Sequence, residues 1–489
     1  MTLSVLHVAS EASPFAKTGG LADVCAALPR ALARSGARVS LVIPRYRVVD
    51  PARHSLARRL APLPVKLGSR TEEVILYEGR LPGGNVEVTL IDHPLFDREG
   101  IYGDGGTDYP DNGRRFALLG RAALELAHRS GRWPDLVHAH DWQGALALVF
   151  AKRAVPEGRV APATVLTIHN LAFQGIMPRS LVDEIELGWD LFTSEAGEFF
   201  GQHNLLKLGI AHADRITTVS PRYAREMQTP EHGSGLDGFL RERRDRLVGI
   251  LNGIDTEVWD PARDPHLGVR YDAEDRSGKN ACKAALQREV GLPVRAGVPL
   301  FGQISRMTEQ KGHALLSEAT EELARLDAQF LFLGKGERRF EGLLDSLARR
   351  YPARFAVRFE YSDALAHRIT AGSDFIMMPS QFEPCGLNQM YGHRYGTVPI
   401  VRATGGLDDT VVDYDERTRT GTGFKFSEYT APALVSCLKR AAALYRQRDA
   451  LDRLSSQIMR LDHSWSASAR RYLSVYERLN ATRKAALAG

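Results

Sequence analysis

Short apolar runs alternate with helix-period segments along most of this 489-residue chain, and that alternation limits the possible folds more than any other feature. Strands that alternate with helices predict parallel sheets with crossover helices on both faces. In the first half, the expected strands are residues 4–8, 38–43, 86–91, 136–140, 164–168 and 215–219, and the expected helices are residues 21–35, 115–129 and 144–153.

A second alternation follows a connection at residues 257–277, which is rich in Asp, Pro and Arg. Its expected strands are residues 300–304, 329–333, 355–359, 375–378 and 399–401, and its expected helices are residues 312–326, 364–372 and 387–395. We therefore predict an α/β protein of two Rossmann-like, doubly wound domains that face each other across a deep cleft. The predicted domains are residues 1–256 and 257–460, and a helical tail at residues 461–489 is expected to pack back on the first.

Composition excludes several classes of protein. Lys and Arg exceed Asp and Glu by only 5 and are dispersed, so nucleic acid is not an expected partner. The four cysteines form no C-x-x-C pair, which is typical of free thiols in a reducing compartment. The N-terminus lacks a basic signal-peptide region, and the longest apolar run, near residues 145–151, is too short to span a membrane. A cytoplasmic location without membrane attachment is expected.

A glycine pair, Gly19 and Gly20, follows the first strand between Lys17 and Asp23. Glycines there let the backbone approach a ligand, and the following helix start offers N–H groups to an anion. The alternative interpretation is a tight turn from strand to helix that requires positive φ. The loop lacks G-x-G-x-x-G spacing, which disfavours a nicotinamide-dependent dehydrogenase.

Two histidines, His138 and His140, lie on one face of an expected strand, with Asp141 and Trp142 at its carboxyl end. A metal site is one interpretation of the pair. Because no further His or Cys cluster has suitable spacing, hydrogen-bonded core histidines are favoured. Asp141 and Trp142 suit a sugar, since a carboxylate accepts hydroxyl hydrogen bonds and an indole packs on C–H surfaces. His169 ends the next strand at the same edge.

In the second half, Arg306 and Lys311 follow a strand and precede a helix, so two cations lie near a helix N-terminus. An anion between them would relieve their repulsion. The alternative is a solvated helix start in which Glu309 pairs with one cation. Further glycine loops, at residues 333–336 and from Thr404, also follow strands. Together these loops predict a nucleotide or phosphate ligand.

Glu383 lies in a loop after the strand at residues 375–378. Pro384 restricts Glu383 to extended geometry and Gly386 precedes a helix, so the carboxylate has a defined direction. The alternative is an ordinary cap or loop acid. Cys385 has no dedicated base beside it, so a packed thiol is favoured over a nucleophile.

In these residues the sequence resembles the bacterial glycogen synthases and plant starch synthases, a family of retaining glycosyltransferases with the two-lobed GT-B fold. The similarity extends from residue 5 to about residue 412. Its motifs match in order: Lys17-Thr18-Gly19-Gly20-Leu21-Ala22-Asp23-Val24, Asp141-Trp142, His169-Asn170, Asn252-Gly253-Ile254-Asp255, Arg306 with Gln310-Lys311-Gly312, and Glu383-Pro384-Cys385-Gly386-Leu387-Asn388-Gln389.

The resemblance implies transfer of glucose from ADP-glucose to the nonreducing-end 4-hydroxyl of an α-1,4-glucan, such as a glycogen primer, with retention of configuration. It implies that Arg306 and Lys311 hold the diphosphate and that Glu383 is the acidic residue under the donor glucose. It also implies that His169 is a catalytic residue that lines the sugar pocket. The remaining implied substrate-binding residues are Lys17, Gly19, Gly20, Asp23, Asp141, Asn252, Tyr361, Cys385, Gly386, Leu387, Asn388 and Thr404.

The physical chemistry of that transfer agrees with these residues. Preorganised Arg and Lys stabilise the charge that develops on a leaving diphosphate, so no metal or other cofactor is expected. Glycosidases use two carboxylates that flank the bond, whereas only Glu383 is available here. A front-face route with ion-pair character is therefore expected, with Glu383 stabilising positive charge.

Some positions depart from the family pattern. Gln381 stands where Arg is common before Phe-Glu, Glu360 precedes Tyr361 where Gly is usual, and Asp408-Asp409 follow the Thr404 loop. Competing interpretations are a related transferase that uses UDP-glucose or a small acceptor, a phosphorylase with pyridoxal phosphate on a lysine, and a noncatalytic glucan-binding protein.

Overall fold

The computed structural model describes residues 2–488, which form two compact units. The first unit contains the chain up to Val219, Ala224–Gly253, and the segment from Trp465 onward. The second contains Ser220–Tyr223 and Ile254–Ser464. The final helix, α17 (Trp465–Ala488), therefore belongs to the first unit.

The first unit is built on a sheet whose parallel strands run in the order β15-β14-β10-β9-β1-β2-β6. Their bounds are β1 (Ser4–Val8), β2 (Arg38–Pro44), β6 (Glu87–Asp92), β9 (Leu136–His140), β10 (Ala163–Ile168), β14 (Arg215–Thr218) and β15 (Leu247–Gly249). Antiparallel strands β3 (Ala57–Arg58), β4 (Leu63–Leu67) and β5 (Arg70–Arg80) extend it beyond β6. The direction of chain progression reverses between β1 and β9, where ligands bind in sheets of this kind.

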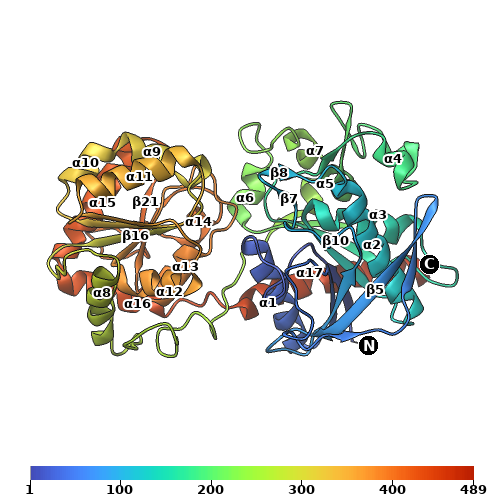
Figure 1. The fold of residues 1–489 in the computed structure, drawn as a ribbon, viewed down its shortest axis with the longest axis horizontal. Helices are drawn as coiled ribbons and strands as arrows, with labels where there is room; N and C mark the ends of the chain where they lie inside the picture. Colours follow the sequence, from blue (N-terminus) through green and yellow to red (C-terminus); the bar gives the residue numbers. More distant parts are fainter. Residues whose placement is uncertain (1, 489) are drawn as a thin grey trace. The chain divides into compact units, whose positions relative to one another are not determined.

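Helices cover this sheet, and short strands lie outside it. Figure 1 shows α1 and α17 packed together, and α2, α3 and α5 likewise. The helices are α1 (Gly20–Arg34), α2 (Asn112–Arg129), α3 (Asp141–Arg153), α4 (Leu181–Glu184), α5 (Leu205–His212) and α7 (Asp237–Arg241). The residues of α6 (Pro221–Glu226) are divided between the two units. The outlying strands are β7 (Gly103–Asp104), β8 (Thr107–Asp108), β11 (Ile176–Met177), β12 (Glu198–Phe199) and β13 (Gln202–Asn204).

The second unit contains a fully parallel sheet in the order β18-β17-β16-β19-β20-β21. Its strands are β16 (Leu300–Ile304), β17 (Gln329–Leu333), β18 (Phe355–Arg358), β19 (Phe375–Met378), β20 (Val398–Arg402) and β21 (Phe424–Phe426). Four phenylalanines stack across neighbouring strands with ring centroids 5.1–5.2 Å apart, namely Phe375, Phe301, Phe330 and Phe355. Here too the order reverses at the first strand, between β16 and β19.

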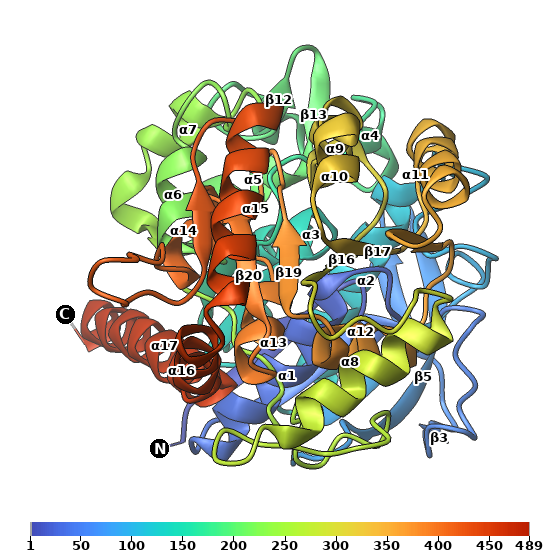
Figure 2. The same ribbon diagram turned by 90° about the vertical axis from the view of Figure 1, so that its left-hand side faces the viewer.

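Helices cover both faces of this second sheet. Figures 1 and 2 show α9, α10, α11 and α15 on one face and α8, α12 and α13 on the other. The helices are α8 (Ser277–Glu289), α9 (His313–Glu318), α10 (Thr320–Arg325), α11 (Arg338–Arg350), α12 (Asp363–Gly372), α13 (Asn388–Arg394), α14 (Gly405–Thr410), α15 (Ala431–Arg446) and α16 (Arg448–Met459).

The single helix predicted at residues 312–326 is wrong. The chain forms α9 and α10 instead, separated at Ala319. Gly312 precedes them in the left-handed region, with φ +82°, and a Cβ there would lie 2.1 Å from the carbonyl oxygen of Pro379. The helix therefore starts only after this close backbone contact.

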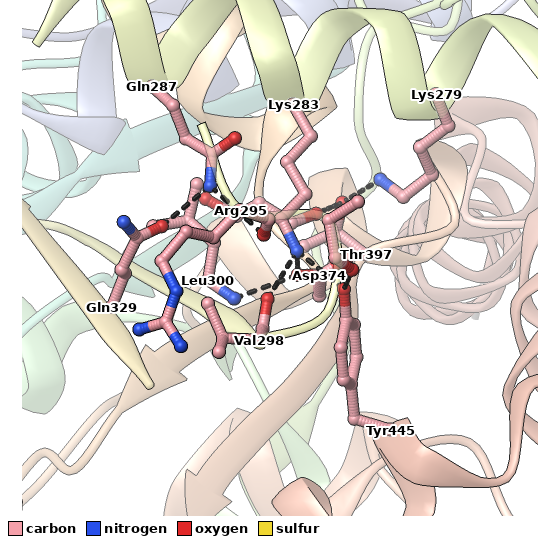
Figure 3. Close-up of polar contacts among 12 residues, drawn as sticks. Lys279, Lys283, Gln287, Arg295, Val298, Leu300, Gln329, Asp374, Thr397 and Tyr445 are labelled. Carbon is pink, nitrogen blue, oxygen red and sulfur yellow. Dashed lines mark hydrogen bonds and ion pairs between the residues drawn. The ribbon is translucent and has the colours of Figure 1, made fainter. Parts of the chain in front are cut away.

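A buried polar network anchors α8 to the second sheet (Figure 3). Nζ of Lys283 lies 2.6 Å from Oδ2 of Asp374 and donates to the hydroxyl of Tyr445 and to the carbonyl oxygen of Val298. The same carboxylate oxygen accepts the backbone N–H of Leu300. One ion pair thus connects α8 with the starts of β16 and β19 and with α15.

Two expectations from the sequence concern free cysteines and membrane-spanning segments. All four cysteines are free and buried. Within residues 2–488, no helix combines the length and the apolar character that crossing a bilayer requires.

Removing one member of the buried ion pair should be strongly destabilising. We expect Lys283→Met to lower the free energy of unfolding by about 3–5 kcal/mol, because Asp374 would remain buried without its cation. Urea unfolding of the full chain measures the change. The matched control is Arg368→Met, which removes a surface pair with Glu289 of the same helix α8 and should cost under about 1 kcal/mol. Equal losses in the two variants would contradict the anchoring role.

Candidate active site

The predicted residues of the first unit gather at the carboxyl edge of its sheet, around the reversal between β1 and β9. The loop with Lys17 and Gly19 follows β1 and leads into α1, whose first turn contains Asp23. Asp141 follows β9, and His169 follows β10. Asn252 comes shortly after β15 and is 7% exposed, with its Oδ1 buried and without a hydrogen-bond partner in the described part of the chain.

A buried carboxylate, Glu11, holds the glycine-pair loop in position. It accepts hydrogen bonds from the backbone N–H and the hydroxyl of Thr18, at 2.5 and 2.8 Å, and from the hydroxyl of Tyr102 at 2.7 Å. Nζ of Lys17 in the loop lies 3.0 Å from Oδ1 of Asp23 in the first turn of α1. Sequence reasoning missed Glu11, whose only signal is an acid directly after an apolar strand.

The positive-φ alternative for the glycine pair is wrong. Gly19 is extended, with φ −163°, and Gly20 is not among the glycines with positive φ. A Cβ added at Gly19 would meet no atom within 4 Å, so the space beside its backbone is open. The pair therefore leaves room for close approach to a ligand at the start of α1.

Asp141 joins β9 directly to α3 through a positive φ of 52°, which is uncommon for a residue other than glycine. Its Oδ1 accepts the backbone N–H of His169 at 2.7 Å. Burial raises the pKa of Asp141 to about 7, although the backbone hydrogen bonds from His169 and Asn170 act in the opposite direction. The carboxyl group thus links the ends of β9 and β10.

The expectation that Trp142 stacks on a sugar is wrong. The side chain is buried, with its ring edge-to-face on Phe116 at 5.1 Å. A Cβ on Gly175 would lie 2.5 Å from Cε3 of Trp142, so the backbone of Gly175 covers the indole.

The histidines of β9 are buried and hydrogen-bonded, as the favoured interpretation predicts. Both ring nitrogens of His138 are used, by the hydroxyls of Thr167 and Tyr476 at 2.6 and 2.7 Å. One nitrogen each from His7, His138 and His140 lie within 4.8 Å of one another, a proximity that a metal could use. A metal would have to displace one of the hydrogen bonds of His138, both of whose nitrogens are used, so the arrangement does not favour one.

In the second unit, the candidate cations and acid follow the two strands at the reversal. Arg306 comes after β16, is exposed, and forms no ion pair with any residue from 2 to 488. Nζ of Lys311 lies 2.5 Å from Oε2 of Glu383, with side-chain exposures of 19% and 9%. The hydroxyl of Ser380 donates to the same oxygen at 3.0 Å. The structure therefore brings the predicted lysine and glutamate into direct contact.

The turn after Glu383 lies at the same carboxyl edge of the second sheet. Cys385 is buried and Gly386 adopts φ +69°. Leu387 precedes α13, whose first residue, Asn388, donates from its side chain to the carbonyl oxygen of Ile304 at 2.6 Å. Thr404 is buried directly before α14. The hydrogen bond from Asn388 to Ile304 ties the turn to the end of β16.

Tyr361 and the positions that depart from the family pattern follow strands of the second sheet. Tyr361 is 74% exposed in the loop between β18 and α12. Glu360 and Gln381 are exposed. Asp408 pairs with Lys425 at 2.8 Å, which offsets one of the two additional negative charges.

The raised pKa of Asp141 predicts a pH effect on stability. The native state binds this proton more tightly than an unfolded chain, in which an Asp pKa is about 3.8. The stabilising contribution is therefore fully present below about pH 4 and is lost as the pH rises through about 7. In urea unfolding at a series of pH values, the wild-type free energy should fall relative to Asp141→Asn across this window. The variant keeps the acceptor for the N–H of His169, so parallel pH curves would refute the shift.

Comparison with known proteins identifies relatives over the whole chain. The family described as "Starch synthase catalytic domain" matches residues 4–242, and "Glycosyl transferases group 1" matches residues 291–454. A glycogen synthase of Anaeromyxobacter dehalogenans is 49% identical over 98% of this chain and 100% of its own. Glycogen synthase 1 of Geobacter metallireducens is 47% identical over 97% and 96% of the two chains.

A solved structure supports the same assignment. The catalytic domain of starch synthase IV from Arabidopsis thaliana, bound to ADP and acarbose, superposes with a TM-score of 0.91 at 34% identity, covering 98% of this chain and 100% of that one. The predicted α/β class with two doubly wound, GT-B-type domains is thus confirmed. The chain belongs to the glycogen synthase and starch synthase family of glycosyltransferases and is a hexosyltransferase of that family.

Proposed function

We propose that this enzyme transfers glucose from ADP-glucose to the 4-hydroxyl at the nonreducing end of an α-1,4-glucan, with retention of configuration, in glycogen biosynthesis. The observation that carries the proposal is the contact of Lys311 with the buried Glu383 at the reversal of a parallel sheet, where Arg306 follows the first strand and forms no ion pair within residues 2–488. Names of relatives support the substrates: they are glycogen synthases, and the starch synthase IV structure contains ADP and acarbose.

In this proposal, Arg306 and Lys311 bind the diphosphate of the donor. Negative charge grows on the diphosphate as its bond to the anomeric carbon breaks, so fixed cations stabilise the transition state more than the bound substrate. Lys311 pairs with Glu383, and the diphosphate would draw the ammonium group away from the carboxylate. These residues would supply the positive charge that a metal provides in other transferases, and we propose that no metal or other cofactor takes part.

Glu383 would then stabilise the positive charge that develops on the donor sugar. Its carboxylate is nearly buried and accepts a hydrogen bond from Ser380, which limits its motion. With Glu383 as the one carboxylate proposed to act on the sugar, a front-face transfer through an ion pair accounts for retention without a covalent intermediate. The turn from Cys385 to Asn388, together with Thr404 and Tyr361, would complete the binding of the nucleotide sugar.

The first unit would supply the sugar-binding groups. Asp141 and Asn252 offer oxygens and amide hydrogens to hydroxyls, and His169 offers a ring nitrogen at the same sheet edge. Lys17 and the open backbone at the glycine pair would meet the phosphate end of the donor. We propose residues 1–256 as the acceptor and sugar domain, residues 257–460 as the nucleotide-sugar domain, and the cytoplasm as the location.

Nucleotide release distinguishes this function from its rivals. ADP release from ADP-glucose should depend on a glycogen primer and should be lost in Glu383→Ala, whereas UDP-glucose should be a poor donor. A preference for UDP-glucose would favour the related transferase. Absence of release with every glucan would favour a noncatalytic glucan-binding protein.

The two cations can be tested separately from the fold. We expect Arg306→Ala or Lys311→Ala to lower kcat on the order of 100-fold, because each removes a preorganised group that stabilises the leaving charge. Arg349→Ala is the matched control, since Arg349 is an exposed cation of the same unit that pairs only with Asp345. Steady-state ADP release measures all three, and wild-type kcat in either site variant would remove that residue from the mechanism.

A further inference from the structure

A row of imidazoles crosses three adjacent strands at the carboxyl edge of the first unit's sheet. Nε2 of His169, directly after β10, lies 3.0 Å from Nδ1 of His140, the last residue of β9. Nε2 of His140 lies 3.0 Å from Nδ1 of His7 in β1. His7 and His140 are completely buried, whereas His169 is partly exposed. The row therefore connects a candidate sugar-binding residue with the interior of the unit.

A fourth histidine lies beside this row but outside it. His138 is as buried as His140, and the centroids of their rings are 4.3 Å apart. Its nitrogens bond the hydroxyls of Thr167 and Tyr476 rather than another imidazole. His138 thus touches the row only by ring packing, which makes it an internal control.

The inner end of the row carries a cost in stability. Nε2 of His7 is buried and has no hydrogen-bond partner in the described residues. An unpaired buried polar atom is destabilising, and an apolar side chain would avoid that cost. Among the residues that the structure describes, the His7 side chain hydrogen-bonds only with His140. Natural proteins keep unpaired buried polar groups mainly at functional sites. The bond between His7 and His140 is therefore expected to have a functional role.

Neutrality links the protons of the three rings. Burial lowers the pKa of His7 and of His169 to about 3 and holds the pKa of His140 well below its usual range. A neutral imidazole has one donor and one acceptor nitrogen. If His140 donates to Nε2 of His169, the proton of His169 is on Nδ1; if His140 accepts, Nδ1 carries a lone pair. Nδ1 is the ring nitrogen that remains for a ligand.

We infer that His140, with His7 behind it, is a positioning residue for His169. The row fixes the ring orientation of His169 and couples the position of its proton to those on His140 and His7, so that Nδ1 meets a hydroxyl of the bound sugar in one defined hydrogen-bonding role. The inference rests on the proposed function, in which His169 contacts the sugar.

Two amide variants of His140 separate its two bonds. The amide of Asn reaches about as far as Nδ1 of a histidine, and that of Gln about as far as Nε2. His140→Asn therefore keeps a partner for His169, whereas His140→Gln keeps only a partner for His7. We expect kcat to fall by less than about threefold in His140→Asn and by on the order of tenfold or more in His140→Gln, with KM for the primer little changed.

A spectroscopic readout tests the ring directly. Long-range proton–nitrogen NMR spectra of histidine-labelled protein should show one tautomer at His169 in the wild type and in His140→Asn, and a mixture in His140→Gln. His138→Asn is the control: it should leave the tautomer of His169 and kcat unchanged. Equal losses of kcat in all three variants, or an unchanged tautomer in His140→Gln, would overturn the inference.

Failure of the proposed function has a different signature. If His169→Ala keeps wild-type kcat, the sugar-binding role of His169 is wrong and the catalytic part of the inference falls with it. The tautomer comparison is independent of turnover, so a mixed tautomer already present in the wild type would overturn the positioning role even in a fully active enzyme.

Discussion

Contact between main chains at the carboxyl edge of the second sheet determines how the candidate donor site is built. A Cβ at Gly312 would lie 2.1 Å from the carbonyl oxygen of Pro379, and one at Gly405 would lie 2.0 Å from that of Glu383. The loops after β16, β19 and β20 therefore touch through backbone atoms, where only glycine fits. Because Lys311 precedes Gly312 in one of these loops and Glu383 lies in another, this contact brings ammonium and carboxylate to 2.5 Å.

The two units use burial in opposite ways at their sheet edges. In the first unit, desolvation lowers the pKa of His169 to about 3 and raises the pKa of Asp141 to about 7, which favours the neutral form of both groups. In the second, Arg306 is exposed and Lys311 pairs with a carboxylate. Neutral groups suit sugar hydroxyls and cations suit a diphosphate, which are two parts of a nucleotide sugar.

The sequence predicted the central strands and most of the candidate residues at their ends, because buried parallel strands have continuous apolar runs that end in turn residues. It missed α8, whose buried face includes Lys283 and Gln287, so that its apolar period is hidden. It also missed α11, although Phe340, Leu344 and Leu347 have helical spacing. The antiparallel strands β3 to β5 lie outside the βαβ alternation on which the prediction relied.

The sequence by itself determined the α/β class, the order of the strands along the chain and the residue types that end them, because each of these is encoded within a few neighbouring positions. Only the tertiary structure decided that Trp142 is covered by Gly175 and that Glu11 holds the glycine loop. It also decided that His7 meets His140, 133 positions away in sequence. Protonation state and exposure depend on such distant neighbours, since they follow from desolvation and partners that the folded chain alone supplies.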